Sequence, residues 1–464
     1  MKSFTHHAAS PGGRPPGTPR GPEGPVTSSR HLGRGLALTG ATTVILLLAA
    51  CGGSSSSGAA GGTGTTSGGT INIGVIGPMT GPAAEIGNLM SGACYAAALD
   101  VNKAGGVLGR KVSCNLVDDT GDPADAVPNV SKALATTSNL DMAVGLESNT
   151  AATTIPLVNN AHIPMVSTNG LVAYDKTHDT YFWRMTPSDD QNGAAFYAWA
   201  ARKGYKRVAV VFQNNIGAQG NDPGVVAAVK KDGGTMTTNI TIPGDASSYS
   251  SVVARVLAGK PQALILAGDP QTSATFLSEY KQLNNGKAPP VVTSTDSITP
   301  AYFGAVQKVM GTNYMTHDMA FVGSYVSPAS PAFAVYKKAV YGASQIKDPA
   351  TILGVGVIAS IYDGINLMAL AMQKAHSTTG TAYNADIGKI AAGSAGATVV
   401  SSYASALAAL KAGKAIRYEG VGGVITFNGY HNSPGSFSAS GFDAKGNPVL
   451  LGVIPGSQVA QLLS

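Results

Sequence analysis

The stretch Ile71-Asn72-Ile73-Gly74-Val75-Ile76, followed by Gly77-Pro78-Met79-Thr80-Gly81-Pro82, decides the fold of this chain. Its first six residues form a short apolar run rich in β-branched side chains, which is typical of a buried strand. The glycines and prolines end that strand, and the next apolar pattern predicts a helix over residues 86–103. A short buried strand followed by a helix is the repeating unit of a parallel sheet that helices cover on both faces.

The same alternation continues along the chain in two series. Two series of this kind predict an α/β fold with two doubly wound parallel-sheet lobes. The part of the chain beyond residue 70 is also too long for a single core. The expected strands are 112–117, 142–144, 164–166, 207–212, 236–242 and 263–266. The expected helices are 124–136, 151–160, 196–203, 225–231, 252–257 and 273–283.

Beyond residue 300 the pattern favours helices. A long apolar helix is expected over 350–374 and another over 402–410. A strand is expected over 424–427, and a hairpin with a Lys445-Gly446-Asn447 turn over 441–453.

The N-terminal region carries an export signal. Arg30 and Arg34 precede an apolar run over 36–50 that is too short to span a bilayer, so a transmembrane anchor is disfavoured. Leu48-Ala49-Ala50-Cys51 resembles the bacterial lipobox, in which the thiol is lipidated and becomes the new N-terminus. Residues 52–69 contain only Gly, Ser, Ala and Thr, a composition typical of a flexible linker. We therefore expect a leader at 1–50, a lipidated linker at 51–70, and a location outside the cytoplasm, anchored to the cell membrane.

Charge and cysteine content narrow the function classes. The net charge of +6 falls to +2 once the leader, with five basic residues and one acidic residue, is removed. No basic stripe remains, so we expect no nucleic-acid partner. Besides Cys51 the chain has Cys94 and Cys114, and an even pair in an exported chain predicts a disulfide; two separately buried thiols are the alternative.

Residues 71–82 resemble the opening of type I periplasmic binding proteins, and the branched-chain amino-acid (leucine-binding) branch is the most similar in pattern. Asp100-Val101-Asn102, Gly105-Gly106-Val107-Leu108-Gly109-Arg110 and Asp118-Asp119-Thr120 also resemble that branch. The resemblance implies two lobes joined by three crossovers near Asp189, Thr295 and Phe427, with a small ligand closed between them. The implied lobes are 71–188 plus 296–426, and 189–295 plus 427–464.

The first lobe offers a candidate anion site. Ser148-Asn149-Thr150 follows a predicted strand and precedes a helix, where free backbone N–H groups and the helix dipole favour an anion. The resemblance implies that Ser148 binds the ligand carboxylate, and an N-cap is the alternative role. After the next strand, Asn169 is a candidate contact, and Leu171 stands in place of the family's threonine.

The second lobe departs from the family pattern. The family's acidic contact to the ligand ammonium aligns near Thr272, and Asp269 close by is also typical of a turn. Gln213 and Asn214 offer amides. Asp296 at the second crossover offers a carboxylate for an amine, and a solvated hinge carboxylate is the alternative role. A carboxylic acid or an amide therefore fits this lobe at least as well as a zwitterionic amino acid.

The sequence gives little support for an enzyme. Gly354-Val355-Gly356-Val357-Ile358-Ala359 matches the dinucleotide pattern only formally, because it lies inside an apolar helix and not after a strand. No nucleophile motif occurs, and the histidines lack metal-ligand spacing. We expect neither catalysis nor a metal nor a cofactor.

The sequence thus predicts a monomeric substrate-binding lipoprotein of an ABC importer. Its partners would be a small ligand and a membrane permease, and its mechanism would be hinge closure. A ligand sensor on the same fold and a lipid-anchored hydrolase are the alternatives.

Overall fold

Two separate sheets organise the part of the chain that the structure describes. The computed structural model describes residues 69–136, 140–433 and 435–464. The predicted leader, Cys51 and nearly all of the predicted linker lie outside these residues. None of the helices in the described ranges has the length and apolarity needed to cross a membrane.

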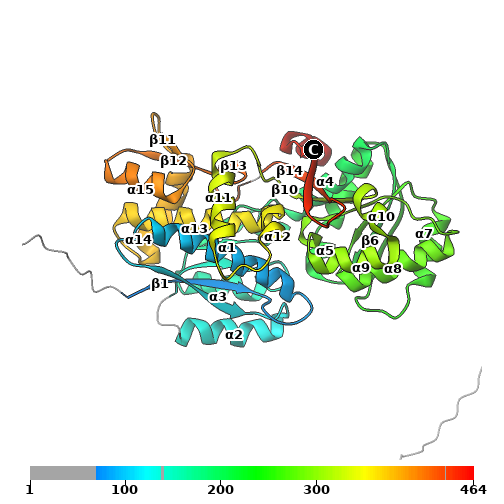
Figure 1. Ribbon diagram of the computed structural model, residues 1–464, viewed down its shortest axis with the longest axis horizontal. Helices are drawn as coiled ribbons and strands as arrows, with labels where there is room; N and C mark the ends of the chain where they lie inside the picture. The colour runs from blue at the N-terminus through cyan, green and yellow to red at the C-terminus, as the bar shows by residue number, and fades with distance from the viewer. Residues whose placement is uncertain (1–68, 137–139, 434) are drawn as a thin grey trace, which may run out of the picture. The chain divides into compact units, whose positions relative to one another are not determined.

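The first sheet has five parallel strands in the order β2-β1-β3-β4-β5. Alternate side chains enter two different cores, as a strand period of two requires. Ile73 and Val75 of β1 pack with α1 and α13, whereas Ile76 packs with α2 and α3. These two pairs of helices lie on opposite faces of the sheet (Figure 1). The strands are β1 (Ile71–Gly77), β2 (Val112–Asp118), β3 (Leu140–Gly145), β4 (Met165–Ser167) and β5 (Phe182–Arg184).

Helices from two distant parts of the chain cover this sheet. The helices expected over 86–103, 124–136 and 151–160 are confirmed, and the last has the expected bounds. A small sheet, β11-β12-β13, lies beside the later helices. The helices are α1 (Ala84–Lys103), α2 (Pro123–Thr136), α3 (Ala151–Asn160), α11 (Pro331–Gly342), α12 (Pro349–Gly354), α13 (Gly356–Ala375), α14 (Gly380–Ala392) and α15 (Tyr403–Lys411). The small strands are β11 (Thr398–Val400), β12 (Ile416–Gly420) and β13 (Gly423–Val424).

The second sheet has seven strands in the order β15-β14-β10-β9-β8-β6-β7. Strands β6 to β10 run parallel, and the C-terminal hairpin β14–β15 adds two antiparallel strands at one edge. The hairpin expected over 441–453 is thereby confirmed. The strands are β6 (Arg207–Gln213), β7 (Thr235–Ile242), β8 (Ala263–Ala267), β9 (Val291–Ser294), β10 (Met319–Ser324), β14 (Phe437–Phe442) and β15 (Pro448–Ile454).

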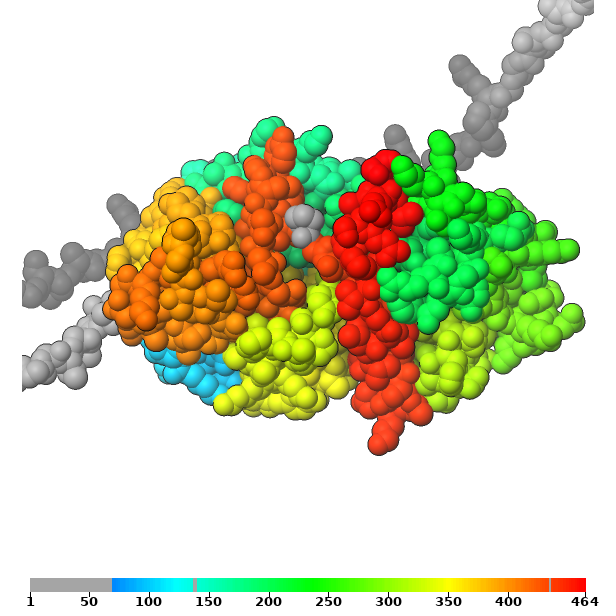
Figure 2. All heavy atoms as spheres, turned by 90° about the horizontal axis from the view of Figure 1, so that it is seen from above, coloured from blue at the N-terminus to red at the C-terminus, as the bar shows by residue number. Residues whose placement is uncertain are grey.

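Helices cover both faces of the second sheet as well. Side chains of α4, α6 and α16 form one core with it, and those of α7, α8 and α9 form the other. In Figure 2 the C-terminal residues, in red, run as a band between the yellow and orange residues of the first lobe and the green residues of the second. These helices are α4 (Asp189–Arg202), α5 (Ile216–Gln219), α6 (Asp222–Lys231), α7 (Ser250–Ala258), α8 (Pro270–Leu283), α9 (Pro300–Met310), α10 (Thr312–His317) and α16 (Gly456–Leu463).

Strand β10 corrects the expected lobe boundary. The sequence analysis assigned 296–426 to the first lobe, but β10 pairs with β9 and β14 in the second sheet. Its residues Met319 to Val322 are buried, so their backbone groups need a hydrogen-bonding strand on each side. The chain therefore crosses to the first lobe after Ser324, and not near Thr295.

The third crossover also lies later than Phe427. Asn432 still bridges to Arg184 of β5, so the chain leaves the first sheet only after this point and joins the second at Phe437. The strand expected over 424–427 is reduced to β13, which pairs with β12 and not with either large sheet. The first crossover, between β5 and α4, lies where the sequence predicted it.

The helix expected over 350–374 is two helices. Val355 separates α12 from α13 with an extended backbone, φ −105° and ψ 104°. A Cβ at Gly356 would lie 2.0 Å from the carbonyl oxygen of Ser324, so the start of α13 packs directly on the end of β10. The glycines of the formal dinucleotide pattern thus serve close packing.

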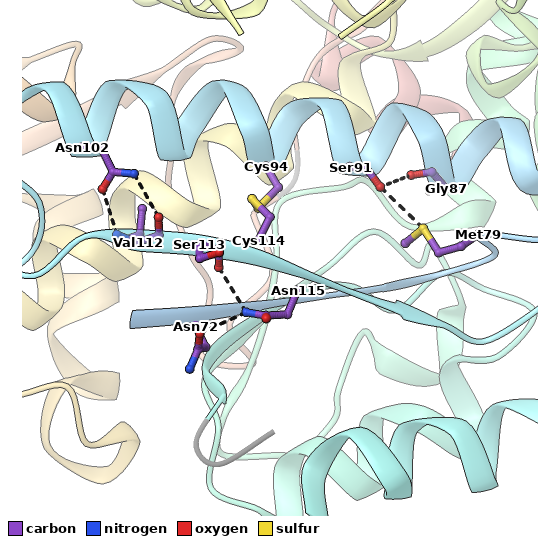
Figure 3. Close-up of a disulfide and its surroundings, with 10 residues drawn as sticks. All are labelled: Asn72, Met79, Gly87, Ser91, Cys94, Asn102, Val112, Ser113, Cys114 and Asn115. Carbon is purple, nitrogen blue, oxygen red and sulfur yellow. Dashed lines mark hydrogen bonds between the residues drawn. A yellow bond between two sulfur atoms is a disulfide. The ribbon is translucent and has the colours of Figure 1, made fainter. Parts of the chain in front are cut away.

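The predicted disulfide between Cys94 and Cys114 is present (Figure 3). The two Cα atoms are 6.1 Å apart, within the range that a disulfide can bridge. The bond links α1 to β2, so it joins a helix of the first lobe to the edge strand beneath it.

Candidate ligand site between the lobes

Two loops meet at the carboxyl edge of the first sheet. Ser148 and Asn149 follow β3, and Gly170 follows β4. The Ser148 hydroxyl oxygen accepts a hydrogen bond of 3.2 Å from the Gly170 N–H, so the loops are held together. Open α/β sheets bind ligands at this edge.

Asn149 connects this edge to the second lobe. Its Oδ1 accepts a hydrogen bond of 3.3 Å from the N–H of Gly217 in α5. Its Nδ2 and backbone N–H donate to Glu147 Oε2 at 3.0 and 2.9 Å, which fixes the orientation of the amide. Desolvation raises the pKa of Glu147 to about 7. The first-lobe loop and α5 are therefore in direct contact across the boundary.

Asp189, the first residue of α4, lies at the first crossover and is buried with 8% exposure. Its Oδ2 atom has no hydrogen-bond partner among the described residues. A Cβ at Gly170 would lie 1.9 Å from Asp189 Oδ1, and one at Gly220 would lie 2.3 Å from Oδ2. The carboxylate thus lies between a first-lobe loop and the end of α5, and it needs glycine on both sides.

Burial raises the pKa of Asp189 to about 7. The positive charge of Arg184 opposes this shift, whereas the negative charges of Asp296, Asp190 and Asp175 reinforce it. From sequence alone Asp189 marks only the first crossover, and Ser188-Asp189-Asp190 is also typical of an ordinary helix start. Only the fold shows that Gly170 and Gly220 bury this side chain.

Asp296 is the exposed carboxylate of this region. It follows β9, and its N–H donates to Ser294 Oγ at 3.2 Å. It is near enough to Asp189 for its charge to raise the pKa of that group. Two carboxylates therefore lie at the boundary, one buried and one open to solvent.

Three other predicted first-lobe residues use their polar groups inside the lobe. The Thr150 hydroxyl donates to Asp119 Oδ2 at 2.7 Å, and its side chain is fully buried. Asn169 Nδ2 donates to Ser167 Oγ at 2.7 Å, and Asn169 Oδ1 accepts from the N–H of Leu171 at 3.1 Å. These bonds stabilise the loops that carry Ser148 and Gly170.

The predicted second-lobe residues hold their own loops together. Asp269 caps α8, because its carboxylate accepts from the Thr272 N–H at 2.7 Å and from the Thr272 hydroxyl at 2.9 Å. Gln213 Oε1 accepts from the Asp269 N–H at 2.7 Å, and Asn214 Oδ1 accepts from Gln219 Nε2 at 2.7 Å. Thr272, where the family's acid was expected, is a fully buried hydroxyl.

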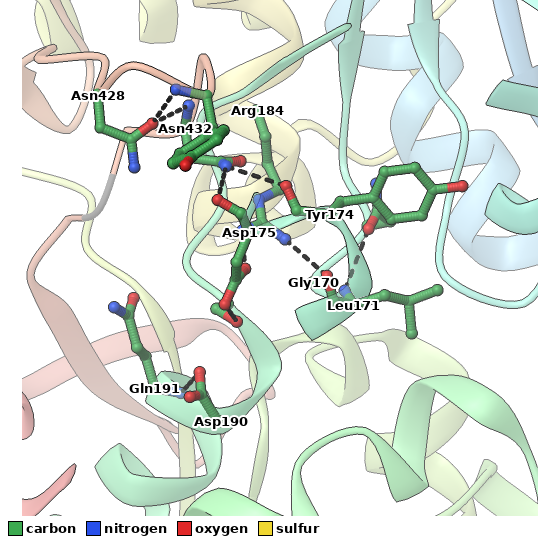
Figure 4. Close-up of polar contacts among 12 residues, drawn as sticks. Gly170, Leu171, Tyr174, Asp175, Arg184, Asp190, Gln191, Asn428 and Asn432 are labelled. Carbon is green, nitrogen blue, oxygen red and sulfur yellow. Dashed lines mark hydrogen bonds and ion pairs between the residues drawn. The ribbon is translucent and has the colours of Figure 1, made fainter. Parts of the chain in front are cut away.

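A buried arginine fixes the first-lobe side of the boundary (Figure 4). Arg184, at 2% exposure, donates to the Leu171 carbonyl at 3.1 Å and forms an ion pair with Asp175. Asn432 Nδ2 donates to the carbonyls of Tyr174 and Asp175, at 3.0 Å in each case. The loop after β4 and the third crossover are therefore both attached to β5.

The three crossovers also enclose a small cavity of about 60 Å³. Pro187 of the first crossover, Tyr325 of the second and Ser436 of the third line it, together with Asp363 of α13. Burial raises the pKa of Asp363 to about 7, and its carboxylate accepts hydrogen bonds from the Tyr418 hydroxyl and the Val421 N–H. Within the described residues, no group of three or more His, Cys, Asp or Glu side chains is arranged to hold a metal ion.

Curated relatives share part of this sequence. A Leu/Ile/Val-binding protein, BraC3, of Rhizobium johnstonii is 30% identical over 203 residues, which are 43% of this chain and 54% of that protein. A Leu/Ile/Val-binding protein homolog of Brucella melitensis is 26% identical over 202 residues, again 54% of its length. The aligned part spans about half the length of these relatives.

Solved structures share the fold. The isoleucine complex of the branched-chain amino acid transporter substrate-binding protein LivJ from Streptococcus pneumoniae has a TM-score of 0.66 at 16% identity, covering 83% of this chain and 99% of that one. A solute-binding protein from R. palustris in complex with benzoate has a TM-score of 0.64 at 18% identity, covering 83% and 97%. Residues 70–436 match the periplasmic binding protein family, so this chain belongs to that family, which consists of binding proteins and not of enzymes.

Proposed function

We propose that this chain is the substrate-binding component of an ABC importer and that a small ligand is enclosed between its two lobes by hinge closure. The observation that carries the proposal is the Asn149–Gly217 hydrogen bond. It joins the carboxyl edge of the first sheet to α5, beside Ser148 and the boundary carboxylates. Two lobes that meet at the ligand-binding edge of a sheet form a site that hinge motion opens and closes.

The polar groups at this boundary favour a ligand with both a carboxylate and an ammonium group. The Ser148 hydroxyl oxygen accepts from Gly170, which leaves its hydrogen free to donate to a ligand carboxylate. Asp296 provides negative charge for a cationic group, and Asp189 adds to this charge only above its pKa of about 7. An α-amino acid satisfies both ends, whereas benzoate satisfies only the first.

The side chain of such a ligand would be aliphatic or small. Ile216, next to Gly217 in α5, is 47% exposed and offers an apolar surface at the boundary. The two named relatives are Leu/Ile/Val-binding proteins, which agrees with an aliphatic ligand. We therefore place branched-chain amino acids first among the candidates, before aromatic carboxylates and amides.

Calorimetry and thermal-shift measurements test the assignment. The panel is isoleucine, leucine, valine, benzoate and the corresponding amino-acid amides. A ligand present at 100 times its Kd adds about 2.7 kcal/mol to the free energy of unfolding. Asp296→Asn should weaken amino-acid binding at least tenfold and leave benzoate unchanged, with Asp443→Asn, in the distant hairpin turn, as the control. Binding of benzoate but no amino acid would contradict the proposed ligand class.

The proposed location of the protein is outside the cytoplasm, where a lipid on Cys51 would anchor it to a membrane. The sequence around Cys51 supports this part of the proposal. Mass spectrometry of the membrane fraction should find a mature protein that begins with acylated Cys51. Cys51→Ala should abolish acylation, and an intact unmodified leader in mature protein would refute the anchor.

A further inference from the structure

A second cavity lies within the first lobe, away from the boundary site. It has a volume of about 770 Å³ and lies between the C-terminal ends of α13, α14 and α15 and the start of β12. Ile390, Leu407 and Ile416 form its apolar floor, with exposures of 1%, 5% and 5%. We name this cavity the lysine groove, because four lysines also line it: Lys374, Lys389, Lys411 and Lys414.

The lysine groove carries net positive charge. All four lysine side chains are exposed. Asp386 forms ion pairs with Lys374 at 3.3 Å and with Lys389 at 3.1 Å. Lys411 and Lys414 form no ion pair with any residue that the structure describes. Two of the four ammonium groups therefore share the carboxylate of Asp386.

Helix ends account for part of this charge. Lys374, Lys389 and Lys411 lie in the last turns of α13, α14 and α15. Each helix C-terminus is equivalent to about half a negative charge, which a lysine there offsets. Three such ends and Asp386 together balance fewer than three lysines, so positive charge remains above an apolar floor. This combination fits an anionic head group joined to an apolar body.

The groove lies beside the point where the N-terminal segment reaches the folded lobe. Arg110 donates to the carbonyl of Gly69 at 2.6 Å and to that of Thr70 at 3.3 Å. The same guanidinium donates to Thr378 Oγ1 at 3.2 Å. Thr378 is separated by one residue from His376, which lines the groove. The predicted lipid tether would therefore hold this end of the lobe near the membrane surface.

We infer that the lysine groove binds the anionic phospholipid head groups of the membrane on which the chain is anchored. Lysine ammonium groups donate to phosphate oxygens, and the apolar floor accommodates the glycerol and upper acyl carbons. Each exposed lysine adds only a modest attraction to an anionic membrane, so the groove alone binds weakly. The predicted lipid on Cys51 lies fewer than 20 residues before Gly69, so it would make the contact intramolecular and therefore effective. The consequence is a fixed orientation of the first lobe on the membrane.

Vesicle co-sedimentation tests the inference with the full chain carrying Cys51→Ala, which removes the acylation site. The vesicles are pure phosphatidylcholine, or phosphatidylcholine with phosphatidylglycerol. Lys411→Gln/Lys414→Gln should reduce binding to the phosphatidylglycerol vesicles about tenfold or more. The matched control, Lys287→Gln/Lys337→Gln, removes two equally exposed charges outside the groove and should bind as the parent does. Added salt should abolish the difference, because screening weakens exposed charges.

Three results would overturn the inference. One is equal binding of the groove variant and its control. Another is equal binding of the parent to both vesicle types, which would assign the contact to the apolar leader. The third is a loss seen only in membranes that contain the permease, which would assign the lysines to a protein contact. Thermal melts and ligand titrations verify that the groove variant is folded.

Discussion

The two lobes present opposite arrangements at comparable places in their sheets. In the first lobe, Asn149 accepts a hydrogen bond from the other lobe, and Ser148 beside it bonds to Gly170 of the neighbouring loop. In the second lobe, Asp269, Thr272 and Gln213 bond to one another or to neighbouring backbone. All five are polar residues at or shortly after the ends of strands. A polar residue at a strand end is thus a ligand candidate only if its hydrogen-bonding capacity is not already used within its own loop.

The largest effect is expected at the boundary, from Asp189→Asn. The buried carboxyl of Asp189 has a pKa of about 7, against an ordinary value of 3.8. Between these pH values the folded chain holds a proton that the unfolded chain has lost. The free energy of unfolding therefore falls as pH rises from about 4 to about 7, by an amount of the order of 4 kcal/mol at most.

Asparagine cannot ionise, so Asp189→Asn should remove this part of the fall. The variant should gain stability over the parent at pH 7 to 8, and the gain should vanish near pH 4. Thermal melts across this range measure it, with Asp190→Asn as the control. Glu147 and Asp363, whose pKa values are also raised, are present in both proteins and cancel in the difference. Parallel pH profiles for the parent and Asp189→Asn would show that the boundary does not hold a protonated Asp189.

The disulfide should add to the free energy of unfolding of the first lobe and not to that of the second. Replacing Cys94 and Cys114 by alanine should lower the free energy of unfolding of the first lobe by about 3 kcal/mol, because a cross-link over 20 residues restricts the unfolded chain. The second lobe contains no part of this bond and should melt as before. Calorimetry resolves the two contributions if the lobes unfold separately. An equal loss in both would show that the lobes unfold as one unit.

Ser148→Ala tests the first-lobe edge as a binding surface. Loss of a hydrogen bond to a charged ligand group costs about 1–3 kcal/mol, or roughly a fivefold to 150-fold loss of affinity. Thr272→Ala, at the matching edge of the second lobe, should change affinity far less. Calorimetry with the best ligand of the panel compares the two variants. Unchanged affinity for Ser148→Ala would remove Ser148 from the site.

Asp269→Ala should have the smallest effect. Unlike Ser148→Ala, it should lower stability and leave ligand affinity nearly unchanged. Loss of the α8 cap should lower the free energy of unfolding by about 1 kcal/mol. Affinity should stay within twofold, because the carboxylate is bonded to Thr272 and not directed at the boundary. Chemical denaturation and calorimetry together measure both quantities. A strong loss of affinity would show that the second lobe uses this carboxylate for the ligand after all.

Local pattern was sufficient for parts of both lobes. Strand β1, helix α3 and the C-terminal hairpin follow directly from apolar periodicity and turn residues. Strand β10 was missed because Met319 to Val322 is a short apolar run between helices. A run this short does not distinguish the side-chain period of a strand from that of a helix. Its assignment depends on pairing with β9 and with β14, which lies more than 100 residues later. The error in the second crossover follows from that one strand.

The sequence by itself determined the α/β alternation, the two lobes, the Cys94–Cys114 pair and the position of Ser148 at a strand end, because each depends on neighbouring residues or on simple counting. Only the tertiary structure decided which polar groups are free. Asp189 is buried because Gly170 and Gly220, from different lobes, both lack a Cβ. Thr272 is unavailable because the Asp245 N–H and Asp269 occupy its hydroxyl. Burial and hydrogen-bond saturation depend on partners distant in sequence, so no local pattern contains them.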